Sequence, residues 1–200
     1  MKSLSFYLKN KAYCLTRMIS PIKRTYWALV NYTSAKLWEI KIGKGCVFTG
    51  QVSFSRFPGS RISIGDKCVF NSSKKSNRIG VYSPCMFSTT TTVATIEIGE
   101  GCGFSGTVIG AFLHIKLGKN VRCGANTMIT DSDWHTDDYR TGENHEVIIE
   151  DNVWLGYGVK VLKGVHIGEN SLIGANSVVT KDIPANVIAA GNPCKVIKSI

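Results

Sequence analysis

The sequence predicts an all-β domain, a parallel β-helix with projecting loops, that follows a short helical segment. Three observations support this prediction: six-residue words that open on an aliphatic residue, Ile-Gly pairs that recur along the chain, and a basic first segment of different composition. The 200 residues, 44% of them hydrophobic, are enough for one domain with a real core.

The first segment, residues 1–40, carries seven Lys or Arg and a single acid, Glu39. Its apolar residues fall near helical spacing, which predicts one or two amphipathic helices broken near Pro21. Such a segment would cap the domain by packing on it. Its basic, aromatic-rich face, with Tyr26 and Trp27, would also suit contact with a membrane surface.

From residue 41 to residue 200 the chain consists of six-residue repeats, which we call words, as in VWLGYG-VKVLKG-VHIGEN-SLIGAN. The corresponding pairs Ile149-Glu150 and Ile167-Gly168 begin 18 residues apart, so three words make one turn of a coil. A short strand per word with glycine at the corners is typical of a β-helix, whose coils bury their core by stacking.

Two intervals between these markers are longer than one turn. Ile64 and Ile98 are separated by 34 residues and Leu117 and Ile149 by 32, so 16 and 14 residues leave the coil. The second insertion is the stretch DSDWHTDDYRTGENHE, residues 131–146. A coil is rigid and repetitive, so we expect a projecting loop of this kind to carry function.

The cysteines predict core packing rather than a metal site. Cys46, Cys68 and Cys102 each follow the isoleucine of an Ile-Gly pair by four residues, which implies one shared and crowded environment. The seven cysteines contain no CxxC pair. We expect no metal cofactor.

The net charge and the hydrophobicity pattern restrict the kinds of partner and the cellular location that we expect. The net charge of +10 is compatible with nucleic acid, an anionic membrane or a phosphate-bearing ligand. No nucleic-acid-binding module is recognisable, so we expect no nucleic-acid partner. No signal-peptide pattern opens the chain and no window approaches a membrane span, which predicts a cytoplasmic location, including the inner face of the membrane.

The repeat region resembles the left-handed β-helix of the hexapeptide-repeat acyltransferases, and the resemblance supplies the handedness. The ending GANSVVTKDIPANVIAAGNPCKVIK is similar to that of the acetyl-CoA-dependent sugar O-acetyltransferases, including galactoside, maltose and surface-polysaccharide acetyltransferases. The coil VWLGYG and the loop DSDWH occur in the order that this group shows. The resemblance implies an O-acetyltransferase that acts on a sugar hydroxyl, in cell-surface polysaccharide biosynthesis.

The same resemblance assigns roles to the residues of the loop. His135 would be the general base, which takes a proton from a sugar hydroxyl as that oxygen attacks the thioester of acetyl-CoA. Asp131 and Asp133 would orient the imidazole or bind the sugar, and Trp134 would stack on a sugar face or fill space under the loop. Ser105 stands where galactoside and maltose enzymes carry an asparagine near the acceptor, which favours a cell-envelope acceptor.

The donor would lie along the C-terminal coils. By resemblance, the residues that would contact acetyl-CoA are Gly156, Tyr157, Ala175, Thr180, Lys181, Lys195 and Lys198, with the last two pairing with nucleotide phosphates. The family forms its active sites between neighbouring subunits, so we expect a homotrimer. His145 has no assigned role, and His114 and His166 are expected to be structural, with His166 facing outward.

Two alternative functions remain open at this point, and the spacing of the histidines argues against a third. A xenobiotic acetyltransferase would use a similar histidine loop, and a non-catalytic scaffold would need only the coil. A γ-class carbonic anhydrase would need paired zinc histidines, whereas the four histidines here stand at 114, 135, 145 and 166.

Overall fold

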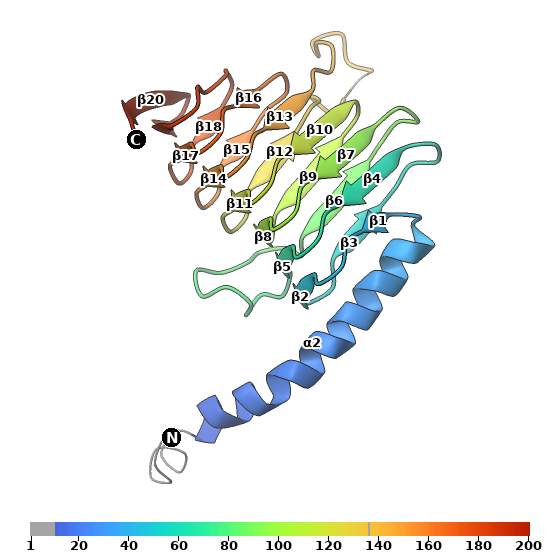
Figure 1. Ribbon diagram of the computed structural model, residues 1–200. Helices are drawn as coiled ribbons and strands as arrows, with labels where there is room; N and C mark the ends of the chain where they lie inside the picture. The colour runs from blue at the N-terminus through green and yellow to red at the C-terminus, as the bar shows by residue number, and fades with distance from the viewer. Residues whose placement is uncertain (1–10, 136) are drawn as a thin grey trace.

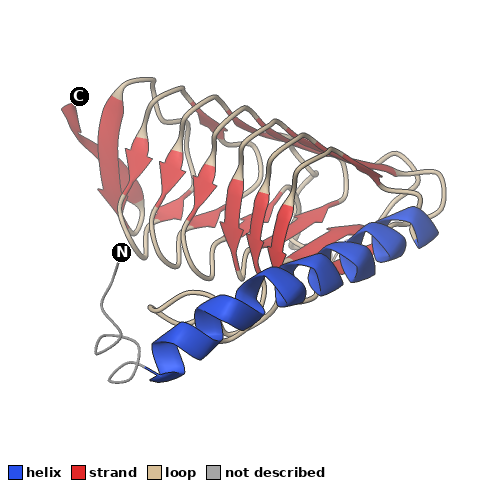
Figure 2. Ribbon diagram, turned by 60° about the horizontal axis from the view of Figure 1, so that its bottom comes forward, coloured by secondary structure: helices blue, strands red, loops and turns tan. Residues whose placement is uncertain are grey.

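A computed structural model describes residues 11–135 and 137–200, with side chains from Ser20 onward. The first ten residues of the predicted helical segment lie outside the described residues. The chain forms one long helix followed by a left-handed parallel β-helix, as the sequence predicted (Figure 1). The helix runs along one side of the N-terminal coils (Figure 2).

The coils are built from three parallel sheets, here named A, B and C. Sheet A contains β1 (Lys41–Ile42), β4 (Arg61–Ile64), β7 (Thr95–Ile98), β10 (His114–Leu117), β13 (Val147–Ile149) and β16 (His166–Ile167). Sheet B contains β2 (Val47–Thr49), β5 (Val69–Asn71), β8 (Gly103–Ser105), β11 (Arg122–Cys123), β14 (Trp154–Leu155), β17 (Leu172–Ile173), β19 (Val187–Gly191) and β20 (Cys194–Ser199). Sheet C contains β3 (Ser53–Ser55), β6 (Met86–Thr89), β9 (Val108–Ala111), β12 (Met128–Thr130), β15 (Lys160–Val161) and β18 (Val178–Val179).

The register of the strands follows the predicted Ile-Gly markers. In sheet A, one column of side chains contains Ile42, Ile64, Ile98, Leu117, Ile149 and Ile167. All but the first of these are buried, because each strand turns alternate side chains inward and each coil covers the next. The final pair, β19 and β20, is antiparallel and closes the C-terminal end.

The cysteines form part of the core, as their spacing predicted. Cys46, Cys68 and Cys102 are buried and lie in one column at the corner between sheets A and B. The thiol of Cys102 lies 3.1 Å from the carbonyl oxygen of Gly118 in the following coil, and that of Cys68 lies 3.4 Å from the carbonyl of Gly99. Contact with Cys102, together with burial, raises the pKa of the Cys68 thiol to about 12.

The helix α2 spans Lys11–Leu37 and corrects one prediction, because Pro21 lies inside it and does not break it. A proline removes one N–H donor and tends to bend a helix, but the hydrogen bonds on either side can persist. The C-terminal half is held by packing of Trp27 and Tyr32 on the core. Asn31, fully buried, donates to the Gly50 carbonyl at 3.0 Å and accepts from the Val52 amide at 2.7 Å.

Both predicted insertions leave the coils as loops. Loop 72–85 joins β5 to β6 at the corner between sheets B and C, and loop 131–146 joins β12 to β13 at the corner between sheets C and A (Figure 1). Sheet C therefore separates the two loops. We refer to their positions as the B–C corner and the C–A corner.

Candidate active site

The root of loop 131–146 is fixed by a buried carboxylate. Asp131 is fully buried, and its two oxygens accept hydrogen bonds from the backbone amides of Phe112, at 2.7 Å, and Leu113, at 2.8 Å. Its carbonyl accepts from the amide of His145 at 3.1 Å, which ties the two ends of the loop together. Asp131 thus holds the loop on the neighbouring coil, and neither oxygen is exposed to a substrate.

The indole of Trp134 lies across the outer face of sheet C. Its Nε1 donates to Thr130 Oγ1 at 2.9 Å, and its ring meets the ring of Phe112 edge-on at a centroid distance of 5.3 Å. A Cβ at Gly110 would lie 2.4 Å from the indole, so only glycine leaves room beneath it. Trp134 as a whole residue is 45% exposed, so its indole covers the coil while part of the side chain faces solvent.

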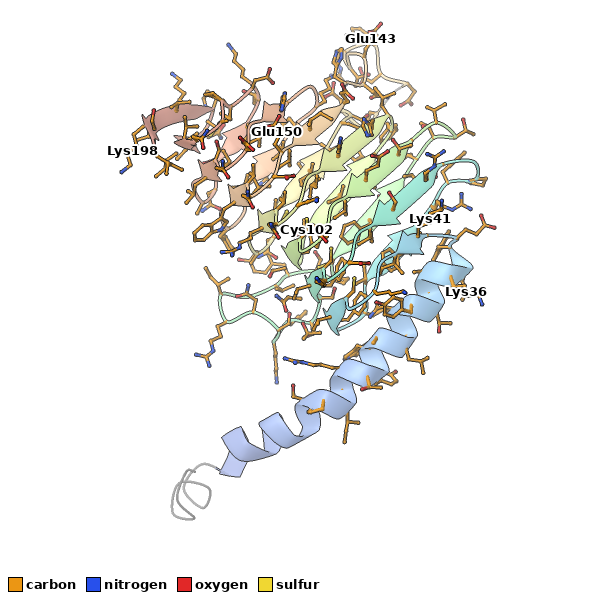
Figure 3. All side chains as sticks on the ribbon, viewed as in Figure 1. Lys36, Lys41, Cys102, Glu143, Glu150 and Lys198 are labelled. Carbon is orange, nitrogen blue, oxygen red and sulfur yellow. The ribbon has the colours of Figure 1, made fainter. Side chains whose placement is uncertain are left out.

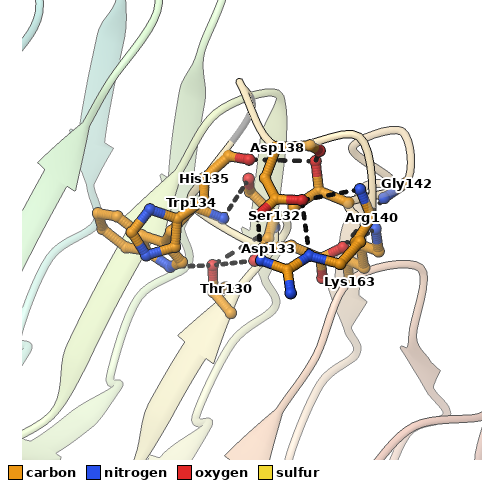
Figure 4. A network of polar contacts seen from close by, with 10 residues as sticks. Thr130, Ser132, Asp133, Trp134, His135, Asp138, Arg140, Gly142 and Lys163 are labelled. Atoms are coloured by element: carbon orange, nitrogen blue, oxygen red, sulfur yellow. Dashed lines mark hydrogen bonds and ion pairs between the residues drawn. The ribbon is translucent and has the colours of Figure 1, made fainter.

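Asp133 attaches the loop to the following coil. One carboxylate oxygen lies 2.6 Å from Lys163 Nζ and accepts from the Gly142 amide at 3.2 Å (Figure 4). The hydrogen bond from Lys163, supported by that of Gly142, lowers the pKa of Asp133. The carboxylate therefore stays ionised at neutral pH and braces the loop from the side.

His135 sits between these anchors with its side chain exposed. Its backbone is held on both sides: the amide donates to the Asp133 carbonyl at 2.9 Å, and the carbonyl accepts from Thr141 Oγ1 at 3.1 Å (Figure 4). No hydrogen bond of the imidazole to another described residue is present. The backbone of His135 is thus positioned by the loop, while its ring nitrogens can meet a ligand.

The B–C corner brings Ser105, a predicted site residue, together with residues that the sequence analysis missed. Ser105 is buried, and its Oγ accepts from Asn71 Nδ2 and from Asn77 Nδ2, both at 3.2 Å. Asn77 belongs to loop 72–85, so that loop brings an amide to Ser105. The polar composition of the insertion was visible in the sequence, but no pattern indicated which side chain would reach Ser105.

Loop 72–85 also reaches the predicted donor residues. The hydroxyls of Tyr82 and Tyr157 lie 2.6 Å apart, and this contact raises the pKa of Tyr82. The Asn126 side chain accepts from the Tyr82 amide at 2.9 Å and donates to the Gly80 carbonyl at 3.2 Å. The loop is thereby fastened along the B–C corner.

The predicted acetyl-CoA contacts fall into three places. Gly156, Tyr157 and Ala175 line the B–C corner, where a Cβ at Gly156 would lie 2.7 Å from the Ala175 backbone nitrogen. Thr180 and Lys181 follow β18 at the C–A corner, in the column of the histidine loop. Lys195 and Lys198 are exposed on β20, and Figure 3 labels Lys198.

Within one chain the structure does not unite all of these residues. Ser105 and Tyr157 lie at one edge of sheet C, whereas His135 and Lys181 lie at the other. A site that used both sets would need the B–C corner of one copy beside the C–A corner of another.

The remaining histidines contact acids or backbone. His166 is exposed, with Nε2 2.8 Å from Glu150 Oε1, and His114 Nδ1 lies 3.0 Å from Glu146 Oε2. His145 contributes its backbone to the loop root and to the Gly164 amide. Among the residues that the structure describes, no group of three His, Cys, Asp or Glu side chains is placed to hold a metal.

A comparison with protein-family models identifies the type of repeat in the coils. Residues 146–181 match the model of the bacterial transferase hexapeptide repeat (six repeats). Galactoside O-acetyltransferase of Lactococcus lactis is 65% identical over 57 residues, 28% of each chain. Galactoside O-acetyltransferase of Escherichia coli is 44% identical over 90 residues, which is 43% of this chain and 44% of that protein. The chain therefore matches less than half the length of these relatives.

Solved structures extend the likeness to most of the fold. An N-acyltransferase from Bacillus cereus, AntD, superposes with a TM-score of 0.61 at 16% identity, covering 84% of this chain and 89% of that one. The polysialic acid O-acetyltransferase OatWY gives a TM-score of 0.57 at 18% identity, covering 79% and 88%. At these identities the likeness concerns the fold alone.

The relatives are named as acetyltransferases, which is the enzyme class that the sequence predicted. The chain is thus a left-handed β-helix protein that carries the bacterial transferase hexapeptide repeat and resembles the sugar O-acetyltransferases of that family.

Proposed function

We propose that the protein transfers an acetyl group from acetyl-CoA to a hydroxyl of a sugar in cell-surface polysaccharide biosynthesis. The observation that carries the proposal is the loop at the C–A corner, which presents an exposed His135 from a backbone held by buried and ionic contacts. General acid–base groups need such fixed placement, because small errors in position lower rates steeply. The 65% identity to a galactoside O-acetyltransferase over 57 residues supports the reaction class.

In the proposed mechanism, neutral His135 takes the proton of a sugar hydroxyl while that oxygen forms a bond to the thioester carbon. The carbonyl oxygen becomes an oxyanion, which a backbone N–H or a group of the neighbouring subunit stabilises. The tetrahedral centre then breaks its C–S bond, and the imidazolium returns the proton to the departing CoA sulfur. Trp134, partly exposed beside His135, provides a face for the sugar.

The donor is proposed to lie along sheet C between two copies of the chain. In a homotrimer, Gly156, Tyr157 and Ala175 of one copy would line the pantetheine path, and Lys195 and Lys198 would face its phosphates. The separation of the B–C and C–A corners supports a shared site, because one chain cannot place both sets beside one ligand. We further propose a cytoplasmic location at the inner face of the membrane.

The test is thiol release from acetyl-CoA by the purified protein across a panel of sugar and antibiotic acceptors. His135→Ala should lower acceptor-dependent release by roughly 10²–10⁴-fold, the usual contribution of a general base. His145→Ala is the matched control, since it removes a second exposed imidazole from the same loop, and it should retain activity. Equal release by wild type and His135→Ala would remove His135 from the mechanism. Release with antibiotic acceptors alone would reassign the acceptor class.

A further inference from the structure

Helix α2 and loop 72–85 enclose a groove at the N-terminal end of the coils, where Figure 1 shows the two segments. The groove has a volume of about 600 Å³. Its lining includes Lys23, Arg24 and Trp27 from the helix and Lys74 and Lys75 from the loop. Two segments far apart in sequence therefore place four cations around one groove.

These cations have no acidic counterpart nearby. Neither Lys11–Leu37 nor residues 72–85 contain an Asp or Glu. Within residues 20–135 and 137–200, no ion pair includes Lys23, Arg24, Lys74 or Lys75. Four unpaired cations around one groove create a local positive potential that favours an anionic partner.

An apolar stripe lies on the same half of the helix. Ile22, Tyr26 and Leu29 follow the i, i+4, i+7 spacing of one helical face, and they are 72%, 56% and 69% exposed. This helical half extends beyond the first coil, which leaves its outer face uncovered in a single chain (Figure 1). Exposed aliphatic residues beside cations match the requirements of an anionic lipid surface, which offers phosphates and an apolar layer at once.

We propose that this surface, the stripe Ile22, Tyr26 and Leu29 together with the basic groove, docks the protein on an anionic membrane. The phosphates of the lipid headgroups occupy the groove, and the stripe enters the interface. A second copy that docks through the same surface is a poorer occupant, because the two surfaces carry the same charge. Nucleic acid would satisfy the cations but would leave the aliphatic side chains without a role.

Docking in this orientation brings loop 72–85 to the bilayer, and with it Asn77, which contacts Ser105. A consequence, which rests on the proposed function, is that the acceptor is presented at the membrane surface. None of the helical segments that the structure describes has the length and hydropathy of a membrane span.

The experiment is co-sedimentation of the full chain with vesicles of phosphatidylcholine, with and without phosphatidylglycerol. We expect binding only to the anionic vesicles. Lys74→Ser/Lys75→Ser should weaken it about 25-fold, from roughly five-fold for each cation near an anionic surface. The matched control is Lys41→Ser/Lys116→Ser, which removes equal charge from exposed positions on sheet A and should bind like wild type.

Two further arms separate the sources of phosphate. Ile22→Ser/Leu29→Ser should weaken vesicle binding without altering calorimetric binding of inorganic diphosphate. Equal binding to neutral and anionic vesicles, an equal loss in the control pair, or tighter binding of an RNA oligonucleotide than of vesicles would overturn the proposal. His135→Ala should bind vesicles normally, so a failed docking result is distinguishable from a failed catalytic one.

Discussion

The substitution Gly110→Ala tests whether the placement of the histidine loop depends on the indole of Trp134. Gly110 lies in β9, and an added Cβ would stand 2.4 Å from Trp134 Cζ2. Ordinary van der Waals contact begins near 3.4 Å, so the ring must move by about 1 Å. The glycine does not have a positive φ, so the backbone itself accepts alanine.

Movement of the indole weakens two contacts. The hydrogen bond to Thr130 Oγ1 contributes about 1 kcal/mol, and the edge contact with Phe112 contributes about 0.5–1.5 kcal/mol. The next residue along the chain is His135. A displacement of about 1 Å at a catalytic group is expected to lower kcat/KM by roughly 100-fold.

The assay is kcat/KM for acetyl transfer, with thermal unfolding as a check on the fold. Gly103→Ala is the control, because Gly103 lies in β8 of the same coil and an added Cβ there meets nothing within 4 Å. We expect the control to match wild type. Wild-type kcat/KM in Gly110→Ala would refute the link between the indole and the loop.

Two other contacts give predictions of their own. The pKa of Asp133 is lower in the folded protein than in the unfolded chain, where it is about 3.9. Its pairing with Lys163 therefore stabilises the loop fully at pH values above about 3.9, and this stabilisation is lost as the pH falls through the folded pKa. The amide resonance of Gly142 should therefore titrate with a midpoint below about 3.9 and stop doing so in Asp133→Asn; a midpoint at or above that value contradicts the pairing. Asn152 has a φ of 58°, and its side-chain amide forms hydrogen bonds with Asn120 and Asn170 in the coils on either side. Both Asn152→Ala and Asn152→Gly remove these bonds, but only glycine adopts the left-handed backbone without strain. Asn152→Ala should therefore lower the free energy of unfolding by about 1 kcal/mol more than Asn152→Gly. Urea unfolding measures this difference, and equal losses would show that the strain is absent.

The coils of the β-helix could be predicted because the residues that define each coil recur at short, fixed intervals in the sequence. The six turns begin with an aliphatic residue that glycine follows in five of them, and a cysteine lies four residues later in three. These residues mark the same position in successive coils, so the register in sheet A and the burial of Cys68 and Cys102 followed from spacing. The two insertions were visible as departures from that spacing. The position of His135 on the second insertion followed in the same way.

The contacts of the inserted loops were not open to prediction, because a loop without a period carries no register. Asp131 and Asp133 are nearly identical in sequence context, yet one is buried under two backbone amides and the other pairs with Lys163. Asn77 reaches Ser105 only because loop 72–85 folds back over its own corner.

The sequence by itself determined the β-helix, the length of a coil and the places where the chain leaves it, because these depend on residues repeated at fixed intervals. The tertiary structure alone decided that α2 continues through Pro21, which carboxylate braces the histidine loop, and that the helix and loop 72–85 share one basic groove. Each of these depends on which segments distant in the chain come to lie side by side, and stacking of the coils determines that arrangement.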